Sequence, residues 1–313
     1  MKTMKFSNLI EISGLAFLLA APLAVIPACG GDDSEEDTAA DDTTGDGDGD
    51  GDPSGDGDGD PTTGDGDGDP TTGDGDGDGD PTTGDGDGDP AEVGMLRLMH
   101  LGVFPDDANT GVDIFVNGEA SGISFEFKDG TDYVELPVGA YDFDIVPAGG
   151  TIDDSVLTVE GFEIAAGDMW EVIAAGYVAS ENEGDAGFTV LALNEDHVDI
   201  PAGNIRLNVF HTGALAALTP VDVWVVNDNC EPVQEILPAF EFGQVAANVD
   251  LPAGPLPLGF DVGQDDTVDA CFVVPDLGGD ILVNAFAVND DAGNVTIVAH
   301  LPDGSVAEVT PQP

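Results

Sequence analysis

The chain has 313 residues, of which 64 are Asp or Glu and only 5 are Lys or Arg, so its formal charge is -59. A charge of this size and sign repels phosphate backbones, which excludes nucleic acid as a partner. The 3 Cys and 4 His have no zinc-binding spacing, so the sequence predicts neither a structural metal nor a cofactor.

The first 28 residues have the pattern of an export signal. Lys2 and Lys5 form a basic start, and the apolar run over 14–26 that follows is too short to span a bilayer. A basic start followed by a short apolar run is typical of a signal peptide that is removed from the mature protein. We therefore expect residues 1–28 to be a signal peptide.

The end of this signal, Ile26-Pro27-Ala28-Cys29-Gly30, resembles the lipobox of bacterial lipoproteins. The resemblance implies that Cys29 is acylated, becomes the mature N-terminus and attaches the protein to a membrane. An ordinary signal peptidase site with an incidental Cys is the alternative. Gly30 is not the Asp that retains such proteins at the inner membrane in enteric bacteria. This favours an exported lipoprotein of the outer membrane or cell surface of a Gram-negative bacterium.

Residues 29–90 form an acidic segment of Gly, Asp, Pro and Thr with a repeated nine-residue unit that begins at Pro61. Residues 30–90 contain 24 acids and no base. Such a segment buries no apolar surface and repels itself, so we expect it to be disordered. A Gly-rich coil of this length spans roughly 40 to 45 Å, and its charge extends it further. The segment is predicted to be a stalk.

The Asp-Gly runs of this segment suggest calcium. Residues 46–51 match the opening of an EF-hand loop, but Gly57 stands at the twelfth position, where a bidentate Glu is required. We therefore expect only weak, diffuse attraction of divalent cations and no specific metal site.

From Ala91 onward the composition is that of a folded all-β protein. Apolar and acidic residues alternate over 141–145, as in a strand with one buried face. Further strands are expected over 112–116, 188–193, 221–226 and 295–299. The helix-like stretch over 214–218 is too short to be stable alone.

An internal repeat predicts two domains, residues 91–200 and 201–313. Motifs return at offsets of 109 to 115 residues, with the differences explained by loop insertions. The pairs are 96–98 with 205–207, 112–116 with 221–225, 125–127 with 240–242, 136–139 with 251–254, and 167–168 with 279–280. About a hundred residues with about seven short strands each fit two tandem immunoglobulin-like β-sandwiches.

The repeat motifs resemble a bacterial family, domain of unknown function 4397. The resemblance rests on Leu-Arg-Leu at 96–98, a following His, Pro-Asp at 105–106, Val-Asp-Ile-Phe-Val-Asn-Gly at 112–118 and a Leu-Pro-x-Gly turn, and it covers about residues 94–305. The second repeat departs from the pattern, with no Pro-Asp after His211. The family implies a secreted or surface-anchored β-sandwich without an assigned activity.

No catalytic constellation stands out. A nucleophilic triad requires a Ser or Cys beside a His, but no Gly-x-Ser-x-Gly elbow is present. His100, His197, His211 and His300 are therefore expected to be structural or surface residues, and Trp170 and Trp224 to be core residues. We expect no enzyme but a non-catalytic envelope lipoprotein that presents two sandwiches for binding a protein or polysaccharide. The alternative is an extracytoplasmic hydrolase that uses loop carboxylates.

With Cys29 assigned to the lipid, Cys230 and Cys271 remain as an even pair within the second repeat. Exported proteins reach a compartment in which disulfides persist. We therefore expect these two residues to form a disulfide, and two buried free thiols are the alternative.

Overall fold

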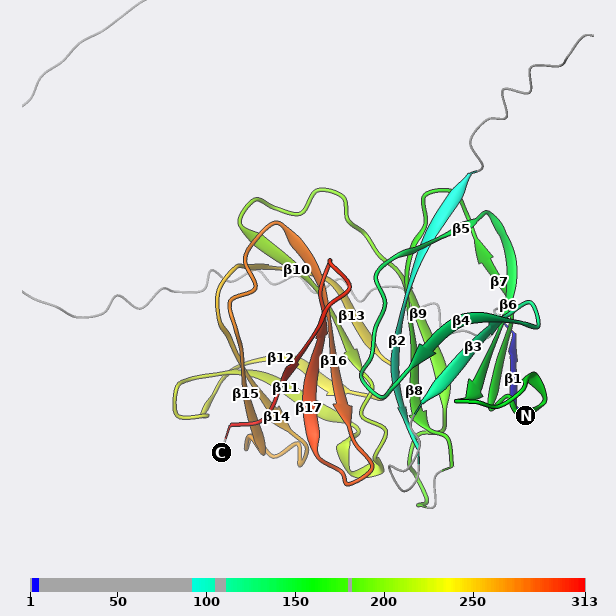
Figure 1. Cartoon of the computed structure of the whole chain (residues 1–313). Coiled ribbons are helices and arrows are strands. Elements are labelled where there is room, and N and C mark those ends of the chain that lie inside the picture. The colour runs from blue at the N-terminus through cyan, green and yellow to red at the C-terminus, as the bar shows by residue number, and fades with distance from the viewer. Residues whose placement is uncertain (1, 6–91, 105–110, 180–181, 313) are drawn as a thin grey trace, which may run out of the picture. The chain divides into compact units, whose positions relative to one another are not determined.

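The computed structural model describes residues 2–5, 92–104, 111–179 and 182–312 (Figure 1). The regular elements in these ranges are β-strands and two short 3-10 helices, η2 (Ile152–Asp154) and η3 (Ala216–Leu218). None of the helices described is long and apolar enough to cross a bilayer. The all-β expectation and the two sandwich-like halves are confirmed.

The first repeat is built from two sheets. Sheet A has the order β1-β7-β6-β3-β4, and sheet B has the order β5-β2-β8-β9. The strands are β1 (Lys2–Lys5), β2 (Val93–Val103), β3 (Val112–Val116), β4 (Glu119–Phe125), β5 (Val134–Pro137), β6 (Gly139–Pro147), β7 (Leu157–Ile164), β8 (Met169–Tyr177) and β9 (Thr189–Asn194).

The second repeat has two sheets of the same plan. Sheet C has the order β13-β10-β16-β17-β18, and sheet D has the order β12-β11-β14-β15. The strands are β10 (Asn204–His211), β11 (Val221–Val226), β12 (Pro232–Phe240), β13 (Val245–Pro252), β14 (Leu256–Asp261), β15 (Ala270–Val274), β16 (Ile281–Asn289), β17 (Val295–His300) and β18 (Val306–Val309).

Numbered within its own repeat, each sandwich has strands 4-1-7-8 in one sheet and 3-2-5-6 in the other. The first strand runs parallel to the seventh, as β2 does to β8 and β10 to β16. An immunoglobulin domain instead places its first two strands side by side in one sheet. The sandwich architecture is therefore confirmed. The strand order differs from that of an immunoglobulin domain, and strand spacing in a sequence does not specify which strands pair.

The expected signal peptide contributes one described element. Strand β1 pairs in parallel with β7, with Lys2 opposite Leu157 and Lys5 opposite Glu160. The remainder of the expected signal and the acidic segment, including Cys29 and the Asp-Gly loop at 46–51, lie outside the described residues.

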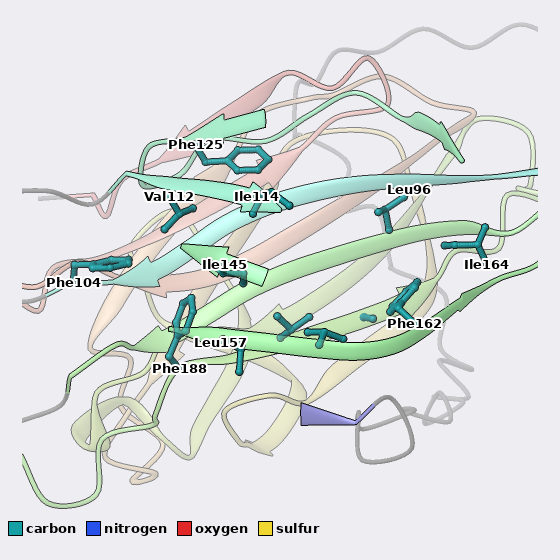
Figure 2. Close-up of a cluster of buried hydrophobic side chains, with 13 residues drawn as sticks. Leu96, Phe104, Val112, Ile114, Phe125, Ile145, Leu157, Phe162, Ile164 and Phe188 are labelled. Carbon is teal, nitrogen blue, oxygen red and sulfur yellow. The ribbon is translucent and has the colours of Figure 1, made fainter. Parts of the chain in front are cut away.

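Each sandwich has an apolar core between its own two sheets. The first core contains residues of β3, β6 and β7 from sheet A and of β2 and β9 from sheet B (Figure 2). The second core, between sheets C and D, is built around Phe260 and Phe272. These cores account for the alternating strands that the sequence shows.

A third apolar cluster joins the two repeats. Met99 and Leu101 of β2 pack with Ile173 of β8 on one side, and with Phe210 and Phe286 of sheet C on the other. Sheets B and C therefore pack face to face, and the layers follow in the order A, B, C, D. This explains why β2 is buried along nearly its whole length: its two faces contribute to two different cores.

Candidate functional site

A connected group of ionisable and amide side chains lies between sheets B and C and is called here the inter-repeat cluster. It comprises Arg97, Tyr133, Glu171, Glu195, His197, Asn208, Asn284 and His300.

Arg97 of β2 is 1 % exposed. Its Nε lies 2.6 Å from Glu171 Oε2 and its Nη2 lies 2.5 Å from Glu195 Oε1, while Nη1 donates to the Leu301 carbonyl oxygen at 3.1 Å. One guanidinium thus pairs with two carboxylates of its own repeat and binds the main chain of the other.

His300, at the end of β17, approaches the same carboxylates from the second repeat. Its Nδ1 lies 3.0 Å from Glu171 Oε1, and its Nε2 lies 2.9 Å from the Thr131 carbonyl oxygen. His300 thus joins an acid and a main-chain carbonyl oxygen of the first repeat from its place in the second.

Two amides extend the cluster into sheet C. Asn284 Nδ2 donates to Glu171 Oε2 and to Glu195 Oε1, each at 2.7 Å. Asn208 Nδ2 donates to Asn284 Oδ1 at 2.9 Å, and its own Oδ1 accepts from the Asn248 amide. Both asparagines are fully buried. The second repeat thus supplies donors to the acids of the first.

Tyr133 and His197 form the outer end of the cluster. The Tyr133 hydroxyl donates to Glu195 and lies 3.1 Å from His197 Nε2, and the Arg97 guanidinium stands over its ring at 4.8 Å. Burial and the nearby Glu195 charge raise the pKa of Tyr133. Burial opposes ionisation of Glu195, but hydrogen bonds from His197 and Tyr133 and the Arg97 charge outweigh it and lower the pKa of Glu195.

The cluster has the side chains of an acid–base site but not the access. The Glu171 and Glu195 side chains are fully buried, and solvent reaches the cluster only at its outer end, where Tyr133 is half-buried and the His197 side chain is about a third exposed. A general base must come within hydrogen-bonding reach of a substrate proton. With these carboxylates occupied by Arg97, Asn284 and His300, the arrangement is suited to holding the repeats together.

A surface groove of about 390 Å³ at one end of the first sandwich offers the second candidate. It is lined by Gly139, Ala140, Glu163, Ile164, Ala165, Asp168 and Trp170. Asp168 accepts hydrogen bonds from Trp170 Nε1 at 3.0 Å, Ala165 N at 2.8 Å and Asn194 Nδ2 at 2.9 Å. This carboxylate therefore orients the indole and closes a turn, which are structural tasks.

The four histidines take several positions. His197 and His300 belong to the inter-repeat cluster, and His211 Nε2 lies 2.8 Å from the Leu218 carbonyl oxygen. The His100 ring packs edge-on to Phe104 with centroids 6.0 Å apart. No group of three or more His, Cys, Asp or Glu in the described ranges is arranged to hold a metal ion.

Cys230 and Cys271 are bridged in the structure, with their Cα atoms 6.0 Å apart. The bridge connects the loop after β11 to strand β15, which is an edge strand of sheet D. Cys29, the expected lipidation site, is not among the described residues.

Sequence reasoning did not find the inter-repeat cluster. Glu171 and Glu195 could not be distinguished among 64 acids, and their partners are up to 129 residues away in the chain. The available signal was the rarity of bases: Arg97 stands within a run of apolar residues, at the position of Arg206 in the other repeat. A lone base in a strand buried on both faces predicts buried acids nearby.

This geometry can be set beside known proteins. Residues 95–218 match the family model for the domain of unknown function DUF4397. The DUF4397 match covers the first repeat from β2 to β9, together with β10 and η3 of the second repeat. From β11 onward the second repeat lies outside it. No curated protein matches the chain.

Two solved structures are similar to parts of the chain. The Bacillus anthracis TIE protein is 14 % identical, with 70 % of this chain and 44 % of that chain covered and a TM-score of 0.17. A leucine-rich repeat protein from Bacteroides thetaiotaomicron VPI-5482 is 12 % identical, with 62 % and 26 % covered and a TM-score of 0.16. The chain thus spans less than half the length of either protein.

Proposed function

We propose that this protein is an exported, lipid-anchored envelope protein whose two sandwiches act as one rigid, non-catalytic module. Cys29 would attach the mature chain to the membrane, and the acidic segment 29–90 would separate the module from the lipid surface. The module would present its outer sheets and loops to a protein or polysaccharide of the envelope.

The observation that carries the proposal is the closed inter-repeat cluster. The two carboxylate side chains that converge in it are fully buried and are occupied by Arg97, Asn284 and His300. The two sandwiches contain cavities of about 40 and 30 Å³, which are too small for a molecule much larger than water. The second repeat has the same strand plan as the first. These features favour presentation of a surface over catalysis.

The test of anchoring is Cys29→Ser. The wild-type chain should incorporate a labelled fatty acid and sediment with membranes, whereas the variant should be unlabelled and appear in the periplasm or medium. A soluble, unlabelled wild type, or continued membrane association of the variant, would refute the anchor.

The test of the non-catalytic role uses the groove that contains Trp170. Purified wild-type protein and Glu163→Gln should release equally little product from isolated envelope polysaccharide. Product release by the wild type that the variant loses would establish the hydrolase alternative instead.

A further inference from the structure

Asp261, the last residue of β14, is a fully buried carboxylate with too few partners. Its Oδ2 is buried and makes no hydrogen bond within the described part of the chain. Its Oδ1 accepts only a long hydrogen bond of 3.4 Å from the Asp265 amide. A buried charge is expensive unless it is paired, so a counter-charge or a proton is required here.

No Lys or Arg side chain within residues 92–312 supplies that counter-charge. After residue 5 the sequence contains only three Lys or Arg residues. Arg97 pairs with Glu171 and Glu195, Lys128 with Glu308, and Arg206 with Asp250. The neutralising group at Asp261 therefore comes from solvent.

Further oxygen ligands surround Asp261. Asp222 of β11 is its cross-strand partner in sheet D, so both side chains leave the same face of the sheet. A Cβ built on Gly263 would lie 3.7 Å from Asp261 Oδ1 and 3.8 Å from Asp265 Oδ1, so these two carboxylates face the same glycine. Carboxylate and main-chain oxygens in a loop are the ligands that Ca²⁺ prefers.

Two acidic side chains accept hydrogen bonds from the loop at 262–269, which follows Asp261. Asp269 Oδ2 accepts from the Val262 amide at 2.8 Å, and Asp222 Oδ1 accepts from Gln264 Nε2 at 3.2 Å. Both contacts hold the start of the loop over Asp261, which removes the carboxylate from bulk water. The loop therefore buries the Asp261 carboxylate, and a bound cation would offset the unfavourable free energy of burying this charge.

The first repeat shows that the fold does not need an acid at this position. Asp113 is the counterpart of Asp222, and its cross-strand partner is Val146, which is also fully buried beneath a loop. A valine fills the position without any charge to neutralise. The carboxylate of Asp261 is thus an addition of the second repeat that packing alone does not explain.

We propose that Asp261, with Asp222, Asp265 and main-chain oxygens of the loop at 262–269, binds a calcium ion. Because no three acidic side chains in the described ranges are already gathered around one point, the loop must close slightly on the ion. The expected dissociation constant is therefore in the range of about 10⁻⁴ to 10⁻³ M that extracellular calcium modules show.

The site can be tested on the full chain with Tb³⁺, whose luminescence is sensitised by a nearby tryptophan. Trp224 follows Asp222 by two residues on the same face of β11, about 7 Å away along the strand. Residues 29–90 contain no aromatic residue, so Tb³⁺ held there gives no sensitised emission. We expect emission that millimolar Ca²⁺ displaces and that K⁺ at equal ionic strength does not.

Variants assign the emission to this site. Trp224→Phe, which installs the residue found at Phe115 in the first repeat, should abolish it, and Trp170→Phe should not. Asp261→Val, which copies Val146, should also abolish it and should remove the rise in melting temperature that Ca²⁺ gives the wild type. Asp154→Asn, an exposed acid of the corresponding loop in the first repeat, is the matched control.

Asp261→Asn serves as a second variant if the valine disturbs the loop, and it should lose both responses as well. Absence of sensitised emission from the wild type would overturn the site. Emission that survives Trp224→Phe, or a calcium response that survives both Asp261 variants, would place the cation elsewhere and overturn it too.

Discussion

The two repeats share one strand plan and have an arginine at the equivalent position of their first strand, but the two arginines have different partners. Arg97 lies on β2 opposite Glu171 of β8, and both are buried between the repeats. Arg206 lies at the corresponding place on β10, but there the parallel strand offers Leu282, and the arginine pairs with Asp250 at the sheet edge. The same fold position thus carries a buried ion pair in one repeat and a partly exposed one in the other.

The two arginines also bind main-chain carbonyl groups in different parts of the chain. Arg206 also donates to the Asp196 and Val198 carbonyl oxygens, so it fastens the linker that enters the second repeat. Arg97 reaches the Leu301 carbonyl oxygen at the far end of that repeat. Lys128 pairs with Glu308 across the same boundary. The three Lys and Arg residues within 92–312 therefore all connect the second repeat to the first repeat or to the linker between them.

The largest effect should come from removing the buried guanidinium. Arg97→Met leaves Glu171 and Glu195 buried with less compensation, which typically costs about 3 to 5 kcal/mol. Arg206→Met is the matched control and should cost clearly less, because the Asp250 side chain is 26 % exposed and can be solvated. Urea unfolding of both variants measures the difference. Equal losses would mean that the two arginines are equivalent and that the buried cluster has no special role.

The disulfide distinguishes the repeats in another way, because only the second has one. Replacing Cys230 and Cys271 by Ser opens a bridge with a sequence separation of 41, which costs about 3 to 4 kcal/mol by the chain-entropy estimate. Since the cluster of Met99, Phe210 and Phe286 is shared, calorimetry should show one transition that moves down as a whole. A first-repeat transition that stays in place would show that the repeats unfold independently.

Much of the fold could be predicted from the sequence, because its signals are local. Alternation over 141–145 and the turn glycines identified strands, and the returning motifs identified two repeats. The strand order could not be predicted, since β2 pairs with β8 at a separation of about 74 residues that leaves no local mark. The inter-repeat packing was missed for the same reason. Glu171 and Glu195 differ from the other acids of the chain only in their partners in the folded structure, and the sequence does not show these partners.

The free energy of unfolding should depend on pH through His211, which ends β10, the first strand of the second repeat. Burial lowers the pKa of His211 from its usual value, with the Leu218 hydrogen bond opposing this only partly. The folded state therefore prefers the neutral ring. Its contribution to stability is fully present above the unfolded pKa of about 6.5 and is lost as the pH falls below it, by at most about 1.4 kcal/mol per pH unit.

His211→Gln keeps a donor for the Leu218 carbonyl oxygen but does not titrate. Between pH 7.5 and 5.5 its unfolding free energy should fall less steeply than that of the wild type. Parallel curves for the two proteins would show that His211 does not control stability in this range.

The smallest effect concerns the exposed ion pair between the repeats. Lys128 Nζ lies 2.8 Å from Glu308 Oε1, and the two side chains are 21 % and 44 % exposed. Exposed pairs are worth about 0.2 to 1 kcal/mol, because water solvates both ions and holding two long side chains costs entropy.

A double-mutant cycle with Lys128→Met and Glu308→Gln should therefore give a coupling free energy in this range at low salt. Screening shortens to about 3 Å at 1 M salt, so the coupling should shrink there. A coupling that persists in 1 M salt would contradict this expectation and would mean that the pair is shielded from solvent.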